Sequence, residues 1–225
     1  MNLQELRKIK SHVRRQVSDA LAGLAPGRRR AAGLAVARRL ATLPPVLRAR
    51  TIMAFLSLPA EIDTWPTIQW AWRKGKRILV PRIEAASAGC NLPPRRRMIA
   101  VVLKAADVAD PARHPDVRPG ALEILEVPGA PPAPIAEIDV VLVPCQAVDR
   151  RGNRLGKGGG FYDRFLADPD LRAETIALAF HEQLLDEVPA AERDRRVRRL
   201  VTDAGMLVFD IGSGRESLGK GVEIA

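Results

Sequence analysis

Apolar residues at intervals of three and four predict that the chain begins with helices. The first apolar stripe consists of Leu3, Leu6, Val13, Val17, Leu21 and Leu24. This spacing places the six side chains on one face of an α-helix. Pro26-Gly27 predicts that this helix ends, and a second helix is expected over roughly 28–42, stopping before Pro44-Pro45.

Short continuous apolar runs follow the helices and predict buried strands. These runs cover 51–58, 77–82, 138–144, 175–180 and, as one or two short strands, 199–209. Between the first two runs, EIDTWPTIQWAWRKGK predicts a loop and then a helix, with Thr64 as N-cap and Pro66 in the first turn. A strand, a helix and a strand at this spacing form a βαβ unit, which indicates a parallel sheet with a right-handed crossover.

Two regions give weaker patterns. The middle of the chain, about 84–137, is rich in proline and predicts loops and a hairpin, with MIAVVL (98–103) as a candidate strand. The last residues, from Ile211, are rich in Gly and Ser and are expected to be mobile. We therefore expect one α/β domain over 1–210 and a flexible tail over 211–225.

Composition excludes several classes of protein. Hydrophobic residues make up 47% and charged residues 28%, values that are ordinary for a globular protein and argue against disorder. No apolar run approaches the ~20 residues of a membrane span, and the N-terminus lacks the apolar segment of a signal peptide. Cys90 and Cys145 lie far apart, in no metal-binding spacing, and are expected to be reduced thiols in a cytoplasmic protein.

Positive charge is concentrated at the start of the chain. The formal net charge is +10, and residues 1–50 hold 12 Lys and Arg against 2 Asp and Glu. A basic segment indicates a nucleic acid, an anionic membrane or an anionic small ligand as partner. The solvated face of ordinary helices explains the same charges, so the pattern leaves these possibilities open.

A glycine-rich stretch, RLGKGGGFYDRFL (154–166), follows the predicted strand 138–144 and leads into a predicted helix. Such a loop binds phosphate through backbone N–H groups and the helix N-terminus, and Arg154 and Lys157 could add full charges. The spacing matches neither common nucleotide-binding glycine motif, so a flexible surface turn is the alternative. The two aromatics and the Asp-Arg pair at its exit favour a binding site.

Two further stretches were weighed for phosphate binding. Lys10 and Arg14 lie four residues apart on one helix face and could clamp a phosphate together, although two solvated cations would show the same spacing. GRESLGKG (214–221) comes close to a P-loop, but Gly221 stands where Ser or Thr must hold Mg²⁺. We therefore reject this second stretch as a nucleotide site.

The glycine-rich stretch and several other segments resemble one known family. NRLGKGGGFYDRFL, placed after IDVVLVP, is similar to the signature of the 5-formyltetrahydrofolate cyclo-ligase family. The pattern Lys10-x-x-x-Arg14 and the segments FLSLPAEIDT, GKRILVPR, IALAFHEQL and VPAAERDRRV match in the same order, so the resemblance spans about 4–208. It departs at Cys145-Gln146, which replaces a small residue, and over 84–134, which matches only in fragments that include Met98.

This resemblance implies a fold and an activity. The expected fold is a three-layer Rossmann-like α/β fold of the CoA transferase-like type, with a mostly parallel central sheet and N-terminal helices. The expected protein is an enzyme that uses ATP and Mg²⁺ to cyclise 5-formyltetrahydrofolate to 5,10-methenyltetrahydrofolate, releasing ADP and phosphate. Its partners would be small-molecule substrates, with no membrane partner and little support for nucleic acid, and it would be a monomer or a homodimer.

The resemblance also implies roles for individual residues. ATP would be bound by Lys10, Arg14, Arg154, Leu155, Gly156, Lys157, Gly158, Gly159, Gly160, Phe161 and Tyr162. The folate would contact Leu56, Glu61, Phe161 and Tyr162, with Glu61 accepting hydrogen bonds from the pterin ring. Asp163 and Asp194 would hold Mg²⁺, and Lys157 and Tyr162 are the expected catalytic residues.

Two other functions stay open from the sequence. The first is a nucleic-acid-binding or regulatory protein that keeps this fold and uses the basic N-terminal helices. The second is a nucleotide-dependent kinase or ligase of unknown substrate, which fits the glycine-rich stretch but not Glu61 and its neighbours.

Overall fold

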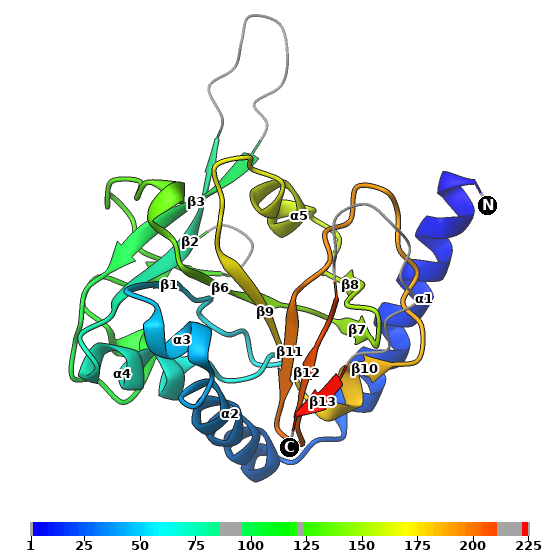
Figure 1. Cartoon of the computed structure of the whole chain (residues 1–225), viewed down its shortest axis with the longest axis horizontal. Helices are drawn as coiled ribbons and strands as arrows, with labels where there is room; N and C mark the ends of the chain where they lie inside the picture. Colours follow the sequence, from blue (N-terminus) through cyan, green and yellow to red (C-terminus); the bar gives the residue numbers. More distant parts are fainter. Residues whose placement is uncertain (1, 86–95, 121–123, 211–221, 225) are drawn as a thin grey trace, which may run out of the picture.

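A large, mostly parallel sheet forms the centre of the molecule (Figure 1). The computed structural model describes residues 2–85, 96–120, 124–210 and 222–224. The sheet has the strand order β13-β12-β11-β9-β6-β1-β2-β3. Its strands are β1 (Thr51–Met53), β2 (Arg77–Ala85), β3 (Arg96–Leu103), β6 (Val140–Pro144), β9 (Glu174–Ala179), β11 (Arg199–Thr202), β12 (Met206–Val208) and β13 (Val222–Ile224). The five strands from β11 to β2 are parallel, and β3, β12 and β13 are antiparallel. The predicted α/β fold with a mostly parallel sheet is confirmed.

Helices cover both faces of this sheet. They are α1 (Leu3–Ala22), α2 (Pro26–Leu40), α3 (Pro44–Arg48), α4 (Trp65–Arg73) and α5 (Phe161–Leu166). Neighbouring strand residues point to opposite faces, so Ile52 packs in one buried cluster with residues of α2 and α4, whereas Met53 packs in a second cluster with Phe165 of α5. The continuous apolar runs of the sequence are explained by this burial on both faces.

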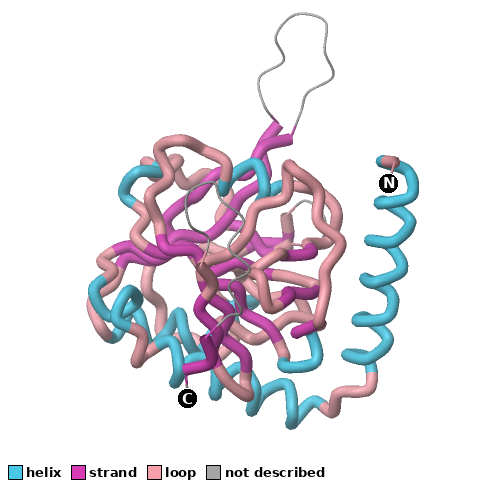
Figure 2. Tube along the Cα trace, turned by 45° about the vertical axis from the view of Figure 1, so that its right-hand side comes forward, coloured by secondary structure: helices cyan, strands magenta, loops and turns pink. Residues whose placement is uncertain are grey.

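The first helix follows its predicted stripe except at its start. Asn2 caps α1, because its side chain accepts hydrogen bonds from the backbone N–H groups of Gln4 and Glu5. Leu6, Val17 and Leu21 are buried, but the side chain of Leu3 is 74% exposed. Figure 2 shows the N-terminal end of α1 extending along one side of the molecule. Leu3 is part of the predicted apolar stripe but is not buried, because the first turn has little to pack against.

Prolines lie in the first turn of three helices. Pro26 lies in the first turn of α2, and Pro44 begins α3, a helix that the sequence pattern did not predict. Proline suits the first turn because its missing N–H would have no partner there. Thr64 precedes α4 as predicted, but its side chain makes no capping bond. The Asp63 carboxylate instead accepts from the Trp65 N–H at 2.9 Å.

The remaining elements are short. A three-stranded sheet has the order β10-β7-β8 and comprises β7 (Ala147–Asp149), β8 (Arg154–Leu155) and β10 (Leu184–Leu185). A two-stranded sheet joins β4 (Arg118–Pro119) to β5 (Leu125–Glu126), and 3₁₀ turns cover Pro111–Arg113, Ile135–Glu137 and His181–Gln183. In the middle of the chain, the candidate strand 98–103 lies within β3, which pairs antiparallel with β2, and β4 pairs antiparallel with β5. The predicted strand over 51–58 was too long, since β1 ends at Met53.

Most of the C-terminal tail, including the stretch 214–221 rejected as a nucleotide site, lies outside the described residues. Within the tail, the backbone of 222–224 forms β13 and pairs with β12. None of the helices in the described ranges combines the length and the apolar character of a membrane span.

Candidate active site

A cavity of about 780 Å³ opens where the parallel strands β1 and β6 end. This volume lies within the range of about 300–1,000 Å³ that is usual for small-molecule sites. The cavity collects every residue for which the sequence predicted a role: Lys10, Arg14, Leu56, Glu61, Arg154, Leu155, Gly156, Lys157, Gly158, Gly159, Gly160, Phe161, Tyr162, Asp163 and Asp194. The structure thus brings these residues together, while their individual roles stay predictions.

The glycine-rich loop connects β8 to α5 and forms one wall of this cavity. Gly158 has φ +105°, a backbone conformation that residues with a Cβ rarely adopt. Arg14 of α1 lies against this loop, and its Nε donates to the Gly156 carbonyl at 2.8 Å. The first helix is therefore attached to the loop that the sequence predicted to bind phosphate.

Lys10, one turn before Arg14, contacts a different part of the chain. Its ammonium forms an ion pair with Asp194. Asp194 also accepts a hydrogen bond from the Ala191 N–H at 2.6 Å. Both cations of the predicted clamp thus face the cavity, and each already contacts an oxygen of the protein.

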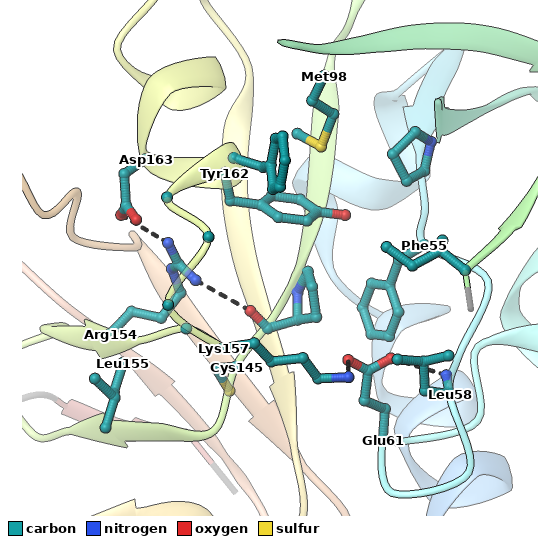
Figure 3. Close-up of a pocket in the computed structure, with 18 of the residues that line it drawn as sticks. Phe55, Leu58, Glu61, Met98, Cys145, Arg154, Leu155, Lys157, Tyr162 and Asp163 are labelled. Atoms are coloured by element: carbon teal, nitrogen blue, oxygen red, sulfur yellow. Dashed lines mark hydrogen bonds and ion pairs between the residues drawn. The ribbon is translucent and has the colours of Figure 1, made fainter. Parts of the chain in front are cut away.

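Arg154 is the most deeply placed cation of the site. Its side chain is 2% exposed, and its Nη2 contacts Asp163 Oδ1 at 2.7 Å. Its Nη1 donates to the Pro144 carbonyl at 3.3 Å, and both contacts are visible in Figure 3. Two of the three guanidinium nitrogens thus contact protein groups, whereas the buried Nε has no hydrogen-bond partner among the described residues. A role for Arg154 in phosphate binding stays a prediction.

An ion pair spans the cavity between the glycine-rich loop and the loop after β1. Lys157 Nζ lies 2.9 Å from Glu61 Oε1, and Figure 3 shows the lysine reaching across to this carboxylate. The other oxygen of Glu61 accepts from the Leu58 N–H at 2.9 Å. The glutamate side chain is 9% exposed and the lysine 46% exposed. The residue expected at the folate and the residue expected at the phosphates are thus in direct contact.

An apolar wall completes the cavity, and sequence reasoning missed most of it as part of a site. It comprises Phe55, Leu58, Pro81, Ile83, Met98 and Ile124. Two of these residues, Met98 and Ile124, come from the middle of the chain, where the sequence pattern was weak. Arg7 also lines the cavity and was missed. Its position three residues before Lys10, on the same helix face, was the signal that could have identified it.

The Tyr162 hydroxyl is buried and unpaired. Its oxygen has no hydrogen-bond partner within the described ranges of the chain. Burial, and then the negative charge of Glu61, raise the pKa of this phenol above its usual range. Tyr162 therefore stays protonated near neutral pH and can only donate or accept as a neutral hydroxyl. Leaving such a group unpaired costs about 1–3 kcal/mol, which favours a ligand atom as its partner.

Cys145 lines the cavity but is poorly suited to act as a nucleophile. Burial raises the pKa of its thiol from 9.0 to about 12. The thiolate is the reactive form, so the thiol is unreactive near neutral pH. Its Sγ donates to the Leu178 carbonyl at 3.6 Å. Cys145 is therefore not expected to act as a nucleophile in this cavity.

Two carboxylates of the cavity, Asp163 and Asp194, are the candidates for holding a metal ion. Mg²⁺ is usually bound by one or two carboxylates together with substrate phosphates. Asp163 and Asp194 both line the cavity, and the N–H of Arg195, next to Asp194, donates to Asp163 Oδ1 at 3.2 Å. In the part of the chain that the structure describes, no cluster of three or more His, Cys, Asp or Glu residues forms a metal site. Two carboxylates are enough only for a magnesium ion that a nucleotide also binds, so Mg²⁺ binding by Asp163 and Asp194 stays a prediction.

Comparisons with known proteins identify the family and support the fold. The model of the 5-formyltetrahydrofolate cyclo-ligase family matches residues 7–203. The cyclo-ligase of Escherichia coli (strain K12) is 33% identical over 184 residues, which cover 80% of this chain and 92% of that protein. The cyclo-ligase of Mycolicibacterium smegmatis is 30% identical over 207 residues, covering 89% of each chain. The solved 5,10-methenyltetrahydrofolate synthetase of Aquifex aeolicus is 23% identical, with a TM-score of 0.71 over 93% of this chain and 97% of that chain. The structural likeness supports the fold.

Proposed function

The chain belongs to the 5-formyltetrahydrofolate cyclo-ligase family, and we propose that its cavity binds ATP next to 5-formyltetrahydrofolate. The protein is thus a ligase of one-carbon metabolism that forms 5,10-methenyltetrahydrofolate, in a family that depends on ATP. We further propose which residues bind each substrate, that Mg²⁺ takes part, and that ADP and phosphate are the other products.

The contact between Lys157 and Glu61 carries this proposal. Lys157, on the glycine-rich loop that would hold phosphates, has its Nζ 2.9 Å from Oε1 of Glu61, the carboxylate that would hold the pterin. The apolar wall, which includes Phe55 and Met98, lines the same cavity and would pack against the pterin ring. Arg7, Lys10 and Arg14 on α1 supply positive charge at the same cavity. One cavity therefore offers an apolar region for a ring and a cationic region for phosphates.

In the proposed reaction, the formyl oxygen takes the γ-phosphoryl group of ATP and ADP leaves. N10 then attacks the formyl carbon and loses its proton, and phosphate leaves with the former formyl oxygen. These reaction steps need no protein nucleophile, which agrees with the raised pKa of the Cys145 thiol. The chain contributes positioning and electrostatic stabilisation. Lys157 would leave Glu61 for the phosphoryl oxygens, and the unpaired Tyr162 hydroxyl would donate to the reacting groups.

Asp163 and Asp194 would hold Mg²⁺ in this proposal. When bound, the ion neutralises negative charge on the phosphate oxygens. Each aspartate now pairs with a cation, Asp163 with Arg154 and Asp194 with Lys10. Both contacts of Asp163 use Oδ1, so its other carboxylate oxygen could serve a metal ion without breaking either contact. Lys10 would move from Asp194 to a phosphate oxygen as the nucleotide binds.

The nucleic-acid or regulatory alternative is less well supported. It requires basic side chains of the first fifty residues to be available to a polyanion. Several of them contact the protein itself instead: Lys10 and Arg14 do so at the cavity, Arg28 pairs with Glu182 and Asp203, and Arg29 donates to backbone carbonyls. These contacts favour an internal role for part of the N-terminal charge.

The proposed function is tested by mixing purified protein with 5-formyltetrahydrofolate, ATP and Mg²⁺ and following the near-UV absorbance of the methenyl product. Product is expected only when both nucleotide and divalent metal are present, with one ADP and one phosphate formed per product. Absence of product under all these conditions, together with tight and salt-sensitive RNA binding, would support the alternative.

Replacing Lys10 or Arg14 by Ala is expected to weaken ATP binding more than folate binding. Each loss should cost about 1.5–3 kcal/mol if the side chain makes a charge-assisted hydrogen bond to phosphate. Titration calorimetry with each substrate measures both affinities. Arg15→Ala is the matched control, because Arg15 is an exposed cation on the same helix outside the cavity lining. Unchanged ATP affinity in both variants would mean that these cations serve the protein structure alone.

A further inference from the structure

Asp149, at the end of β7, is a fully buried carboxylate that makes no contact with the cavity. It accepts four hydrogen bonds from uncharged donors. Oδ1 accepts from the N–H groups of Arg151 at 2.8 Å and Asn153 at 3.0 Å. Oδ2 accepts from Asn153 Nδ2 at 2.8 Å and from the Val188 N–H at 3.2 Å.

These donors belong to two separate parts of the chain. Arg151 and Asn153 lie in the turn 149–153, which leads directly into β8 and the glycine-rich loop. Val188 begins the segment 188–198, which carries Asp194. Asp149 therefore connects the two parts of the chain that bring Arg154, Asp163 and Asp194 to the cavity.

The turn and the segment 188–198 also contact each other at the far end of that segment. Arg196 Nε donates to Asn153 Oδ1 at 3.0 Å, and the Val197 N–H donates to the Gly152 carbonyl at 3.0 Å. A Cβ on Gly152 would lie 2.7 Å from the Val197 carbonyl oxygen, so the approach is too close for another residue. Asp194 thus lies between two attachment points, at Val188 and at Arg196-Val197.

We propose that Asp149 is a positioning residue for the nucleotide and metal half of the site. It sets the position of Asp194 relative to the glycine-rich loop, because it binds the turn and the segment with the same carboxylate. Burying a carboxylate is costly unless it is fully hydrogen-bonded, and here both oxygens are used to join two segments. The proposal rests on the proposed function, since it assumes that Asp163 and Asp194 serve a magnesium nucleotide.

The test is Asp149→Asn, in which one side-chain oxygen becomes an NH₂ group that cannot accept. That group would face backbone N–H donors, so one of the two segments loses its attachment. Side chains that hydrogen-bond directly to metal ligands typically contribute about 10- to 100-fold to metal affinity or activity. Asp149 contacts neither Asp163 nor Asp194 directly, so the lower end, about 10-fold, is expected. We expect a loss of this size in the Mg²⁺-dependent affinity for a non-hydrolysable ATP analogue, measured by calorimetry. The affinity for 5-formyltetrahydrofolate should stay unchanged, and the KM for ATP should rise by a similar factor.

Asp139→Ala is the control for a general loss of stability, because it removes a carboxylate that accepts backbone hydrogen bonds away from the cavity. Asp139 also accepts from backbone N–H groups, those of Arg50 at 2.7 Å and Thr51 at 2.9 Å. It precedes β6 and lies at the opposite end of the sheet strands from the cavity. This variant is expected to lower thermal stability without changing either substrate affinity.

Asn153→Ala keeps the proposal testable if Asp149→Asn does not fold. It removes the side-chain links to Asp149 and Arg196 and should lower the analogue affinity in the same direction, but less. Unchanged analogue affinity in the folded variants, or an equal loss of folate affinity, would overturn the proposal. A wild-type protein that does not bind the analogue would instead contradict the proposed function.

Discussion

Asp163→Asn is expected to abolish turnover and to lower the stability of the protein at the same time. The variant loses the negative charge that Mg²⁺ prefers, so the phosphoryl charge would be poorly neutralised and the chemical step slowed by orders of magnitude. It also leaves the guanidinium of Arg154, which is 2% exposed, without its carboxylate partner. Breaking a buried ion pair by removing one partner costs about 3–5 kcal/mol. Steady-state kinetics and denaturant unfolding measure the two effects.

A double variant separates these two consequences. Arg154→Met together with Asp163→Asn removes both charges, so no unpaired cation stays buried and part of the lost stability should return. Turnover should stay absent, because the metal-binding carboxylate is still missing. A double variant that turns over normally would contradict the proposed role of Asp163 and would restrict the pair to a structural function.

Lys157→Met is expected to reduce kcat strongly while leaving folate affinity unchanged or higher. Removing a single group that stabilises charge in a transition state costs about 10²–10³ in kcat. In the structure, Lys157 forms an ion pair with Glu61, the carboxylate that would bind the pterin. Without the lysine, Glu61 is available and the folate no longer has to displace an ion pair. Single-turnover kinetics and folate titration measure the two quantities separately.

The matched control for Lys157 is Arg164→Met. Arg164 lies on α5, close to the same loop, with its guanidinium 5.0 Å from the centre of the Phe161 ring. It does not line the cavity. Its replacement is expected to leave kcat close to that of the wild type. A Lys157→Met protein with normal kcat and weaker folate binding would mean that the lysine orients Glu61 and does not act on the phosphoryl group.

Much of the fold was predictable because its signals are local. The apolar stripe of α1, the strand runs and the βαβ unit each depend on spacing within a short window, and the structure confirms them. The exceptions have local physical causes. Leu3 is exposed because it lies at the end of a helix that extends along the side of the molecule, and β1 stops at Met53 where the chain leaves the sheet. The middle of the chain gave no periodic signal, so its contribution to the apolar wall could not be predicted.

The sequence alone determined which chemical groups the site contains, because glycine, lysine, aspartate and aromatic residues occur together in one short stretch and in segments that match the family. Only the tertiary structure decided how these groups pair. Lys10 meets Asp194 across 184 positions of the chain, and Arg14 meets the Gly156 carbonyl across 142. Such contacts depend on strand order and on the packing of α1, which no local spacing encodes. For the same reason, the burial of Arg154 against Asp163 and the connection made by Asp149 are visible only in the folded chain.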